Sequence, residues 1–169
     1  MSRLHHSDFV ALIASIYQPK IYLELGLYKG ETFNKVRRVS PNSRCVGVDI
    51  NELSLGGEIY ICTTGEFFEK FNGNADMVFI DADHKYESAL EDFENSLRIL
   101  NPGGCILMHD TDPEKDFLFD SGYCGDSYRL VEHFESRDDV NIVTLPCTEA
   151  GISIITRKDE TRTQRRRNK

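Results

Sequence analysis

Acidic residues and histidines follow two apolar runs of the chain. The first run ends at Asp81, with His84 three residues further on, and the second ends at His109 and Asp110. In an open parallel sheet, the carboxyl ends of neighbouring strands face one crevice in which ligands bind. We therefore expect Asp81, His84 and Asp110 to converge there and to form the outline of a metal and base site.

Each of these residues also has a structural interpretation. Asp81 could cap the helix that follows it, and His109, inside an apolar run, could be a core histidine instead of a ligand. Asp83 either holds His84 in one tautomer or caps the next helix. His5, His6 and His133 lie outside the pattern and are expected at the surface.

A glycine-containing loop follows the first predicted strand. It has the pattern E-x-G-x-x-x-G, with Glu24 inside the strand and Gly26 and Gly30 in the loop. A dinucleotide site uses G-x-G-x-x-G, with the pyrophosphate at a helix N-terminus. A carboxylate in this place suits a cationic ligand better, although the two glycines by themselves also fit a tight strand-to-helix turn.

Apolar periodicity and turn residues predict strands alternating with helices. The predicted strands are residues 21–25, 45–50, 58–62, 77–80, 105–108, 140–145 and 152–156, and the predicted helices are 7–17, 31–39, 65–71, 86–100 and a helix capped by Asp126 that runs to Phe134. This alternation indicates an α/β fold with a doubly wound, seven-stranded, mostly parallel sheet and a C-terminal antiparallel hairpin.

The bulk composition fits one soluble domain. The chain has 169 residues, 40% of them hydrophobic, and a net charge of −8. We expect a domain over residues 1–157 and a basic, disordered tail over 158–169, in which Arg165, Arg166 and Arg167 are a weak candidate for polyanion binding. The acidic body should repel nucleic acid.

No apolar run is long enough to span a membrane and no signal peptide is visible, so we expect a cytoplasmic protein. The five cysteines fit small buried hydrophobes better than disulfides or zinc ligands.

The loop from Glu24 to Gly30, followed by Asp49 at the end of the next strand, resembles the class I S-adenosylmethionine-dependent methyltransferases. The resemblance implies a Rossmann-like domain that binds S-adenosylmethionine. It also implies that Asp49 accepts hydrogen bonds from both ribose hydroxyls, for which a short, acceptor-only side chain is suited. The residues assigned to the cofactor are Glu24, Gly26, Tyr28, Gly30, Asp49, Ile50, Thr63, Thr64 and Asp81.

Residues 76–87, with 100–104 and 107–110, look like the signature of cation-dependent O-methyltransferases, the group allied to catechol, caffeoyl-coenzyme A and macrolide-sugar enzymes. By position, Asp81 and Asp110 match metal-binding carboxylates, with His109 as a further candidate ligand. His84 falls where that group places its catalytic base, beside Asp81. Catechol-type enzymes carry an amide side chain after the second aspartate, and this chain has Thr111 there.

The resemblance implies a definite chemistry. A hydroxyl is a poor nucleophile at neutral pH, so a hard cation lowers its pKa while a base removes the proton. Mg²⁺ suits carboxylate ligands, and a histidine ligand would extend the choice to Mn²⁺ or iron. We therefore predict an S-adenosylmethionine-dependent O-methyltransferase acting on a hydroxyl of a small sugar, diol or catechol-like molecule. The alternatives are a non-catalytic module that binds S-adenosylmethionine or S-adenosylhomocysteine, and a nicotinamide oxidoreductase, whose motif is missing.

Two further features concern the acceptor. The loop 111–124 is long for a compact domain and contains Phe117, Phe119 and Tyr123, which either close over the acceptor or pack on the body or another subunit. Few residues precede the first strand. The pocket is therefore either open to a bulky acceptor or completed by homo-oligomerisation.

Overall fold

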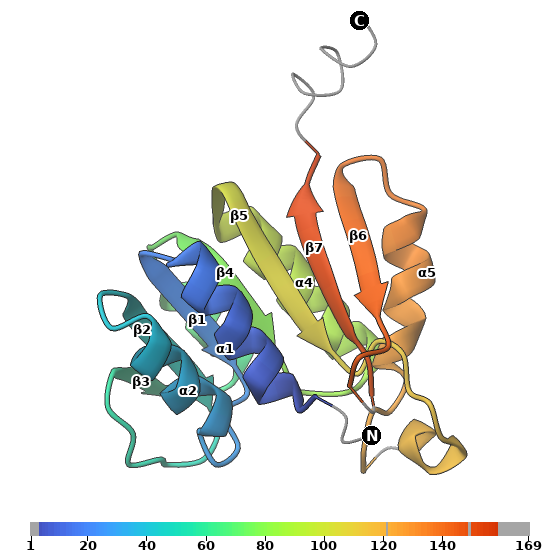
Figure 1. The fold of residues 1–169 in the computed structure, drawn as a ribbon, viewed down its shortest axis with the longest axis horizontal. Coiled ribbons are helices and arrows are strands. Elements are labelled where there is room, and N and C mark those ends of the chain that lie inside the picture. The colour runs from blue at the N-terminus through green and yellow to red at the C-terminus, as the bar shows by residue number, and fades with distance from the viewer. Residues whose placement is uncertain (1–3, 121, 149, 159–169) are drawn as a thin grey trace, which may run out of the picture.

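Seven strands form one sheet in the computed structural model, which describes residues 4–120, 122–148 and 150–158. The strands are β1 (Ile21–Leu25), β2 (Arg44–Asp49), β3 (Glu58–Ile61), β4 (Ala75–Ile80), β5 (Leu100–His109), β6 (Val140–Leu145) and β7 (Ile152–Arg157). Their order across the sheet is β3-β2-β1-β4-β5-β7-β6 (Figure 1). Only β7 runs antiparallel to its neighbours, β5 and β6. The predicted fold class, including the C-terminal hairpin, is confirmed.

Helices cover both faces of this sheet. They are α1 (His6–Tyr17), α2 (Glu31–Val39), α3 (Thr64–Lys70), α4 (Tyr86–Ile99) and α5 (Leu130–Glu135), with short 3-10 turns η1 (Asp116–Phe119) and η2 (Ser127–Arg129). In Figure 1, α1 and α2 lie in front of the sheet and α4 and α5 behind it. The core has two corresponding layers, with α1 and α2 packed in one and α3, α4 and α5 in the other. Such double cover explains why the central strands are apolar on both faces.

The strand β5 is longer than its apolar run predicted. It extends from Leu100 to His109, because Leu100 pairs with Ala75 and the register then shifts before Cys105 pairs with Met77. The residues between Leu100 and Cys105 form an irregularity in the ladder. At the carboxyl end of β5, the strand places His109 beside the end of β4.

Two helix starts are capped by different means. Thr63 and Glu66 form a reciprocal capping box at α3. At α4, by contrast, the carboxylate of Asp126 accepts a hydrogen bond of 2.7 Å from the backbone N–H of Tyr86. The prediction that Asp126 caps its own helix was wrong, since its side chain makes no cap bond there. Asp83 does not cap α4 either, and its Oδ1 accepts from the backbone of Lys85 at 3.3 Å.

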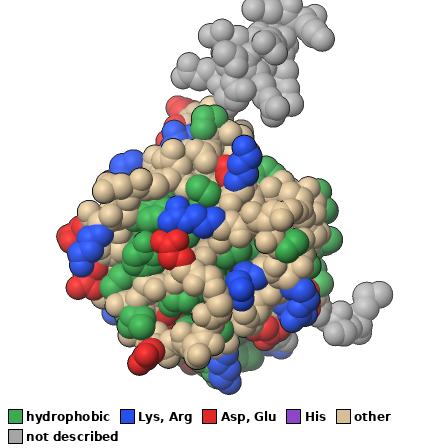
Figure 2. All heavy atoms as spheres, turned by 90° about the vertical axis from the view of Figure 1, so that its left-hand side faces the viewer, with side chains coloured by type: hydrophobic (Ala, Val, Ile, Leu, Met, Phe, Trp, Pro, Cys, Tyr) green, Lys and Arg blue, Asp and Glu red, His purple; other side chains and the backbone are tan. Residues whose placement is uncertain are grey.

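Several predictions from composition can be compared with the described residues. No helix among them is long and apolar enough to cross a membrane. All five cysteines lie in this part of the chain as free thiols, and Cys45, Cys105 and Cys124 are buried. On the face shown in Figure 2, basic and acidic side chains are interspersed. The predicted tail beyond Lys158, including Arg165 to Arg167, lies outside the described residues.

Candidate active site

A single cavity runs along the carboxyl ends of the central strands. Its volume is about 1470 Å³, which is enough for a nucleoside together with a second small molecule. It is lined by all the predicted site residues except Gly30, whose neighbours Lys29 and Glu31 line it: Glu24, Gly26, Tyr28, Asp49, Ile50, Thr63, Thr64, Asp81, His84, His109 and Asp110. The strand topology therefore brings together the motifs that are separated in the sequence.

The first loop lies directly against the end of β4. Gly26 has φ +84°, and a Cβ atom on it would overlap the backbone carbonyl of Asp81. The neighbouring residues continue the sheet, because the backbone N–H of Gly26 donates to Val48 and that of Asp81 to Leu25. A side chain at Gly26 would separate the cofactor-side loop from the acidic cluster, so both the conformation and the space require glycine.

Asp49 joins this loop to the end of β2. Its Oδ2 accepts from the backbone N–H groups of Leu27 and Tyr28 at 2.8 and 3.0 Å, and its Oδ1 accepts from the backbone and side chain of Asn51. Burial acts to raise the pKa of Asp49, but these hydrogen bonds outweigh it and lower the pKa below its ordinary value. These four donors use the roughly four acceptor positions of a carboxylate, so each diol hydroxyl that donates to Asp49 would have to replace one of them. The exposed side-chain amide of Asn51 is the most readily replaced.

Glu24 is almost completely buried within β1. It is 1% exposed, and its Oε2 accepts a 2.5 Å hydrogen bond from the buried hydroxyl of Tyr22. Burial raises the pKa of Glu24 well above its ordinary value, although the bond from Tyr22 acts in the opposite direction. Burial therefore disfavours the carboxylate form of Glu24, which had been expected to face a cationic ligand.

The other cofactor-side residues have distinct surroundings. Tyr28 and Ile50 are large side chains that are 78% and 70% exposed at the cavity. Tyr28 also has φ +50°, a conformation unfavourable for a side chain of this size. Such strain concentrates at functional sites. The hydroxyl of Thr63 belongs to the α3 cap, and that of Thr64 donates to the buried Asp92.

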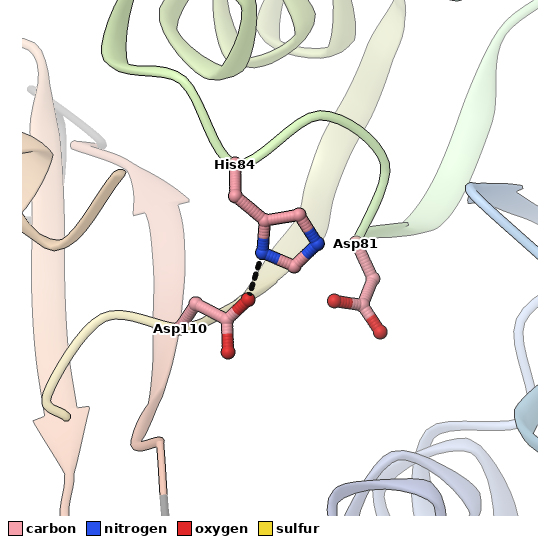
Figure 3. A group of neighbouring side chains, drawn as sticks. All are labelled: Asp81, His84 and Asp110. Atoms are coloured by element: carbon pink, nitrogen blue, oxygen red, sulfur yellow. Dashed lines mark ion pairs between the residues drawn. The ribbon is translucent and has the colours of Figure 1, made fainter. Parts of the chain in front are cut away.

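Asp81, His84 and Asp110 form the acidic cluster at the other end of the cavity (Figure 3). One ligand atom of each lies within 4.8 Å of the others. Nδ1 of His84 pairs with Oδ2 of Asp110, and the ring directs its second nitrogen towards Asp81 (Figure 3). Asp110, not Asp83, is thus the residue that orients His84. Asp110 has φ +60°, a second strained position in the site.

His109 lies between the two carboxylates. Its Nδ1 is 3.1 Å from Oδ1 of Asp81 and 3.0 Å from Oδ1 of Asp110. Burial alone would lower the pKa of His109, but the two carboxylates outweigh it and raise the pKa to about 9. The hydrogen bond that His84 donates to Asp110 raises the pKa of His84 as well. At neutral pH, the positively charged ring of His109 therefore lies between the two carboxylates.

His6 is a site residue that sequence reasoning missed. It was expected at the surface, but it lines the cavity, and its ring centroid is 4.2 Å from that of His109. Burial, followed by the charge of His109, lowers the pKa of His6 to about 4, so this imidazole is neutral. The predicted helix began at residue 7, one position after His6, and its periodicity contains no signal that would bring His6 to the ends of β4 and β5.

Thr111 does not take the place of an amide ligand. It is 4% exposed, does not line the cavity, and its hydroxyl has no hydrogen-bond partner among the residues that the structure describes. The loop that follows forms a wall of the cavity through Leu118, Tyr123 and Cys124. The rings of Phe117 and Phe119 pack instead on Tyr123 and on Tyr128.

A comparison with protein-family models identifies the family of this chain. A family model described as a methyltransferase domain matches residues 23–111, which is more than half of the chain and includes the motifs from β1 to the end of β5. The chain belongs to this methyltransferase family. The resemblance to methyltransferases in the sequence motifs is thereby confirmed. No curated protein matches this methyltransferase in sequence.

Solved structures show the same fold at low sequence identity. The S-adenosylhomocysteine-bound methyltransferase PaMTH1 of Podospora anserina has a TM-score of 0.73 and 15% identity, with 94% of this chain and 80% of that chain covered. The O-methyltransferase TomG of Streptomyces achromogenes, in complex with S-adenosylmethionine, has a TM-score of 0.66 and 18% identity, with 91% and 80% covered. The Bacillus cereus O-methyltransferase in complex with S-adenosylhomocysteine has 0.68 and 18%, with 90% and 80% covered.

Proposed function

We propose that this methyltransferase transfers the methyl group of S-adenosylmethionine to a hydroxyl oxygen of a small molecule, with assistance from a divalent cation. The observation that carries this proposal is the single cavity that joins the Gly26–Asp49 side to the Asp81, His84 and Asp110 cluster. Two of the structures with this fold, both O-methyltransferases, hold S-adenosylmethionine or its product. Their identity to this chain is too low to carry the substrate over.

The cofactor side of the cavity has the features that a nucleoside needs. Asp49 offers carboxylate oxygens at its edge, Tyr28 and Ile50 offer exposed apolar surface, and Gly65 has open space around it. S-adenosylmethionine would supply an electrophilic methyl group on a sulfonium. The buried Glu24, whose charged form is disfavoured by burial, would face that end of the ligand as a hydrogen-bonding group.

The acidic cluster supplies a base. Asp110 holds Nδ1 of His84 and thereby leaves the second nitrogen free to take a proton from an acceptor hydroxyl above Asp81. The bond to Asp110 raises the pKa of His84, which makes it a stronger base once it is deprotonated. The carboxylate of Asp110 would stabilise the imidazolium that forms.

The donor set of this cluster fits a divalent cation. The carboxylates of Asp81 and Asp110 offer oxygen atoms within 4.8 Å of one another, beside the imidazole that is assigned as the base. Asp81 and Asp110 would hold the ion, which would lower the pKa of the acceptor hydroxyl. Their oxygens contact His84 and His109 in this structure. Cation binding should therefore release protons from these histidines, and cation affinity should rise with pH.

Calorimetry and a transfer assay test the proposal. S-adenosylhomocysteine should bind the full chain, and Asp49→Ala should abolish this binding, whereas Glu69→Ala, at an exposed acid on α3, should not. Incubation with methyl-labelled S-adenosylmethionine, Mg²⁺ or Mn²⁺ and a panel of catechols, sugars and small diols should label an acceptor. His84→Gln should stop the labelling and His133→Gln should not. Absence of S-adenosylhomocysteine binding would refute the cofactor assignment, and binding without any labelling would favour a non-catalytic module.

A further inference from the structure

The first turn of α1 adds an imidazole to the acidic cluster. His6 and Asp81 line the same cavity, and the ring of His6 is tilted by 50° against that of His109. His6 lies outside residues 23–111, the segment that matches the methyltransferase family. It is therefore a feature of the site that the family match does not account for.

Polar contacts with α2 determine the position of this turn. The hydroxyl of Ser7 donates to Glu31 at 3.1 Å, and Nζ of Lys35 donates to Ser7 at 2.9 Å and to Asp8 at 2.5 Å. Phe9, on the same turn, is buried in the core. The placement of His6 at the cavity thus follows from the packing of α1 against α2.

The separation of His6 and Asp81 is informative. Nε2 of His6 is 3.9 Å from Oδ2 of Asp81, which is too long for a hydrogen bond. Nitrogen and oxygen ligands of a first-row ion each lie roughly 2.1 Å from the metal, so two ligands of one ion can be up to about 4.2 Å apart. The observed separation falls just inside that limit, which is reached by ligands on opposite sides of an ion. The ligand atoms that this structure brings together belong to Asp81, His84 and Asp110, so cation binding would draw His6 closer to them. Oδ1 of the Asp81 carboxylate is the oxygen that His109 contacts.

We propose that His6 is a ligand of the divalent cation assigned above to Asp81 and Asp110, and that its nitrogen makes the site select Mn²⁺ or Co²⁺ over Mg²⁺. Mg²⁺ takes oxygen ligands and water, whereas imidazole suits transition ions. This inference rests on the proposed cation site and adds to it a ligand from α1 and a choice of metal.

Titration calorimetry of the full chain with MnCl₂, CoCl₂ and MgCl₂ tests this assignment without any turnover. Wild type should bind Mn²⁺ and Co²⁺ more tightly than Mg²⁺. His6→Ala should weaken Co²⁺ binding by at least about tenfold, because the loss of even an indirect partner of a metal ligand costs 10- to 100-fold. His6→Gln, which offers an amide oxygen at a similar reach, should reduce the preference for Co²⁺ over Mg²⁺ and change the visible absorption of bound Co²⁺. His133→Gln, at a histidine outside the cavity, should match wild type.

The outcomes separate this inference from the proposed function. If His6→Ala and His6→Gln bind Co²⁺ like wild type while Asp81→Asn does not bind it, His6 is not a ligand although the cation site stands. If wild type binds S-adenosylhomocysteine but no cation, both the cation site and the role of His6 are refuted. If the wild-type protein binds cations but no S-adenosylhomocysteine, the proposed methyl transfer is refuted. The metal titrations then still decide whether His6 is a ligand. Circular dichroism confirms folding, and His6→Gln decides the matter if His6→Ala is unfolded.

Discussion

Asp92 is a buried carboxyl group on α4 whose ionisation should control stability. It is 2% exposed, and it accepts a hydrogen bond from the hydroxyl of Thr64, which lines the cofactor side of the cavity. Burial raises the pKa of Asp92 from 3.8 to about 6, the bond from Thr64 opposes this shift, and the charges of Glu91 and Asp83 add to it. Folding therefore places an acid that is ionised at neutral pH in surroundings that favour its neutral form.

The sign of the pH effect follows from this shift. A carboxyl group with a higher pKa in the folded than in the unfolded state binds its proton more tightly when folded. Its contribution to stability is fully present below about pH 4 and is lost as the pH rises through about 6. The difference of about two pKa units corresponds to roughly 3 kcal/mol.

Asp92→Asn should remove this penalty. The amide has the same size and can still accept from Thr64, but it does not titrate. We expect the free energy of unfolding to increase by roughly 3 kcal/mol at pH 7.5 and by roughly 2 kcal/mol at pH 5.5, because the gain declines only between the folded pKa of about 6 and the unfolded value of 3.8.

Urea unfolding at pH 5.5, 6.5 and 7.5, followed by circular dichroism or by the fluorescence of the seven tyrosines, measures this change, since the chain has no tryptophan. Glu87→Gln removes one charge from an exposed position of the same helix and should leave the pH dependence unchanged. An Asp92→Asn protein that is no more stable than wild type at pH 7.5, or equally stabilised at pH 5.5, would contradict the reasoning.

Three further substitutions test other contacts. Gly26→Ala forces a side chain onto the backbone carbonyl of Asp81 at a residue with φ +84°. It should therefore destabilise the fold by more than about 1 kcal/mol and weaken S-adenosylhomocysteine binding. A calorimetric Kd equal to that of wild type would count against the close contact. Tyr22→Phe removes the hydroxyl that donates to the buried Glu24 and should lower the free energy of unfolding by about 1–3 kcal/mol in urea titrations. Unchanged stability would show that the 2.5 Å bond is unimportant. His84→Gln should reduce kcat for methyl transfer by roughly 10²- to 10⁴-fold and leave the Kd for S-adenosylhomocysteine unchanged. A kcat within a few-fold of that of wild type would rule out His84 as the base.

Local patterns in the sequence were sufficient to predict the architecture and most of the residues that line the candidate site. Apolar runs and glycines predicted β1 and β6 with their observed bounds, and the proline after α2 predicted its end at Val39. The positions of Asp49, Asp81 and Asp110 at strand ends followed from the same patterns, because parallel strands must present their carboxyl ends at one edge. The bounds of strands and helices depend on residues that are close together in the sequence, and a periodic pattern shows such residues directly.

The chemical state of the site was decided by contacts between distant segments. Asp126 caps α4 from 40 residues away, His6 reaches the cluster only because α1 packs on α2, and the pKa of Glu24 is raised because folding buries this residue. Burial and long-range electrostatics depend on the complete packed structure, in which a pKa responds to every charge and every displaced water nearby. The sequence by itself therefore determined which groups are present at the site, and only the tertiary structure decided which of them are charged, paired or free to act.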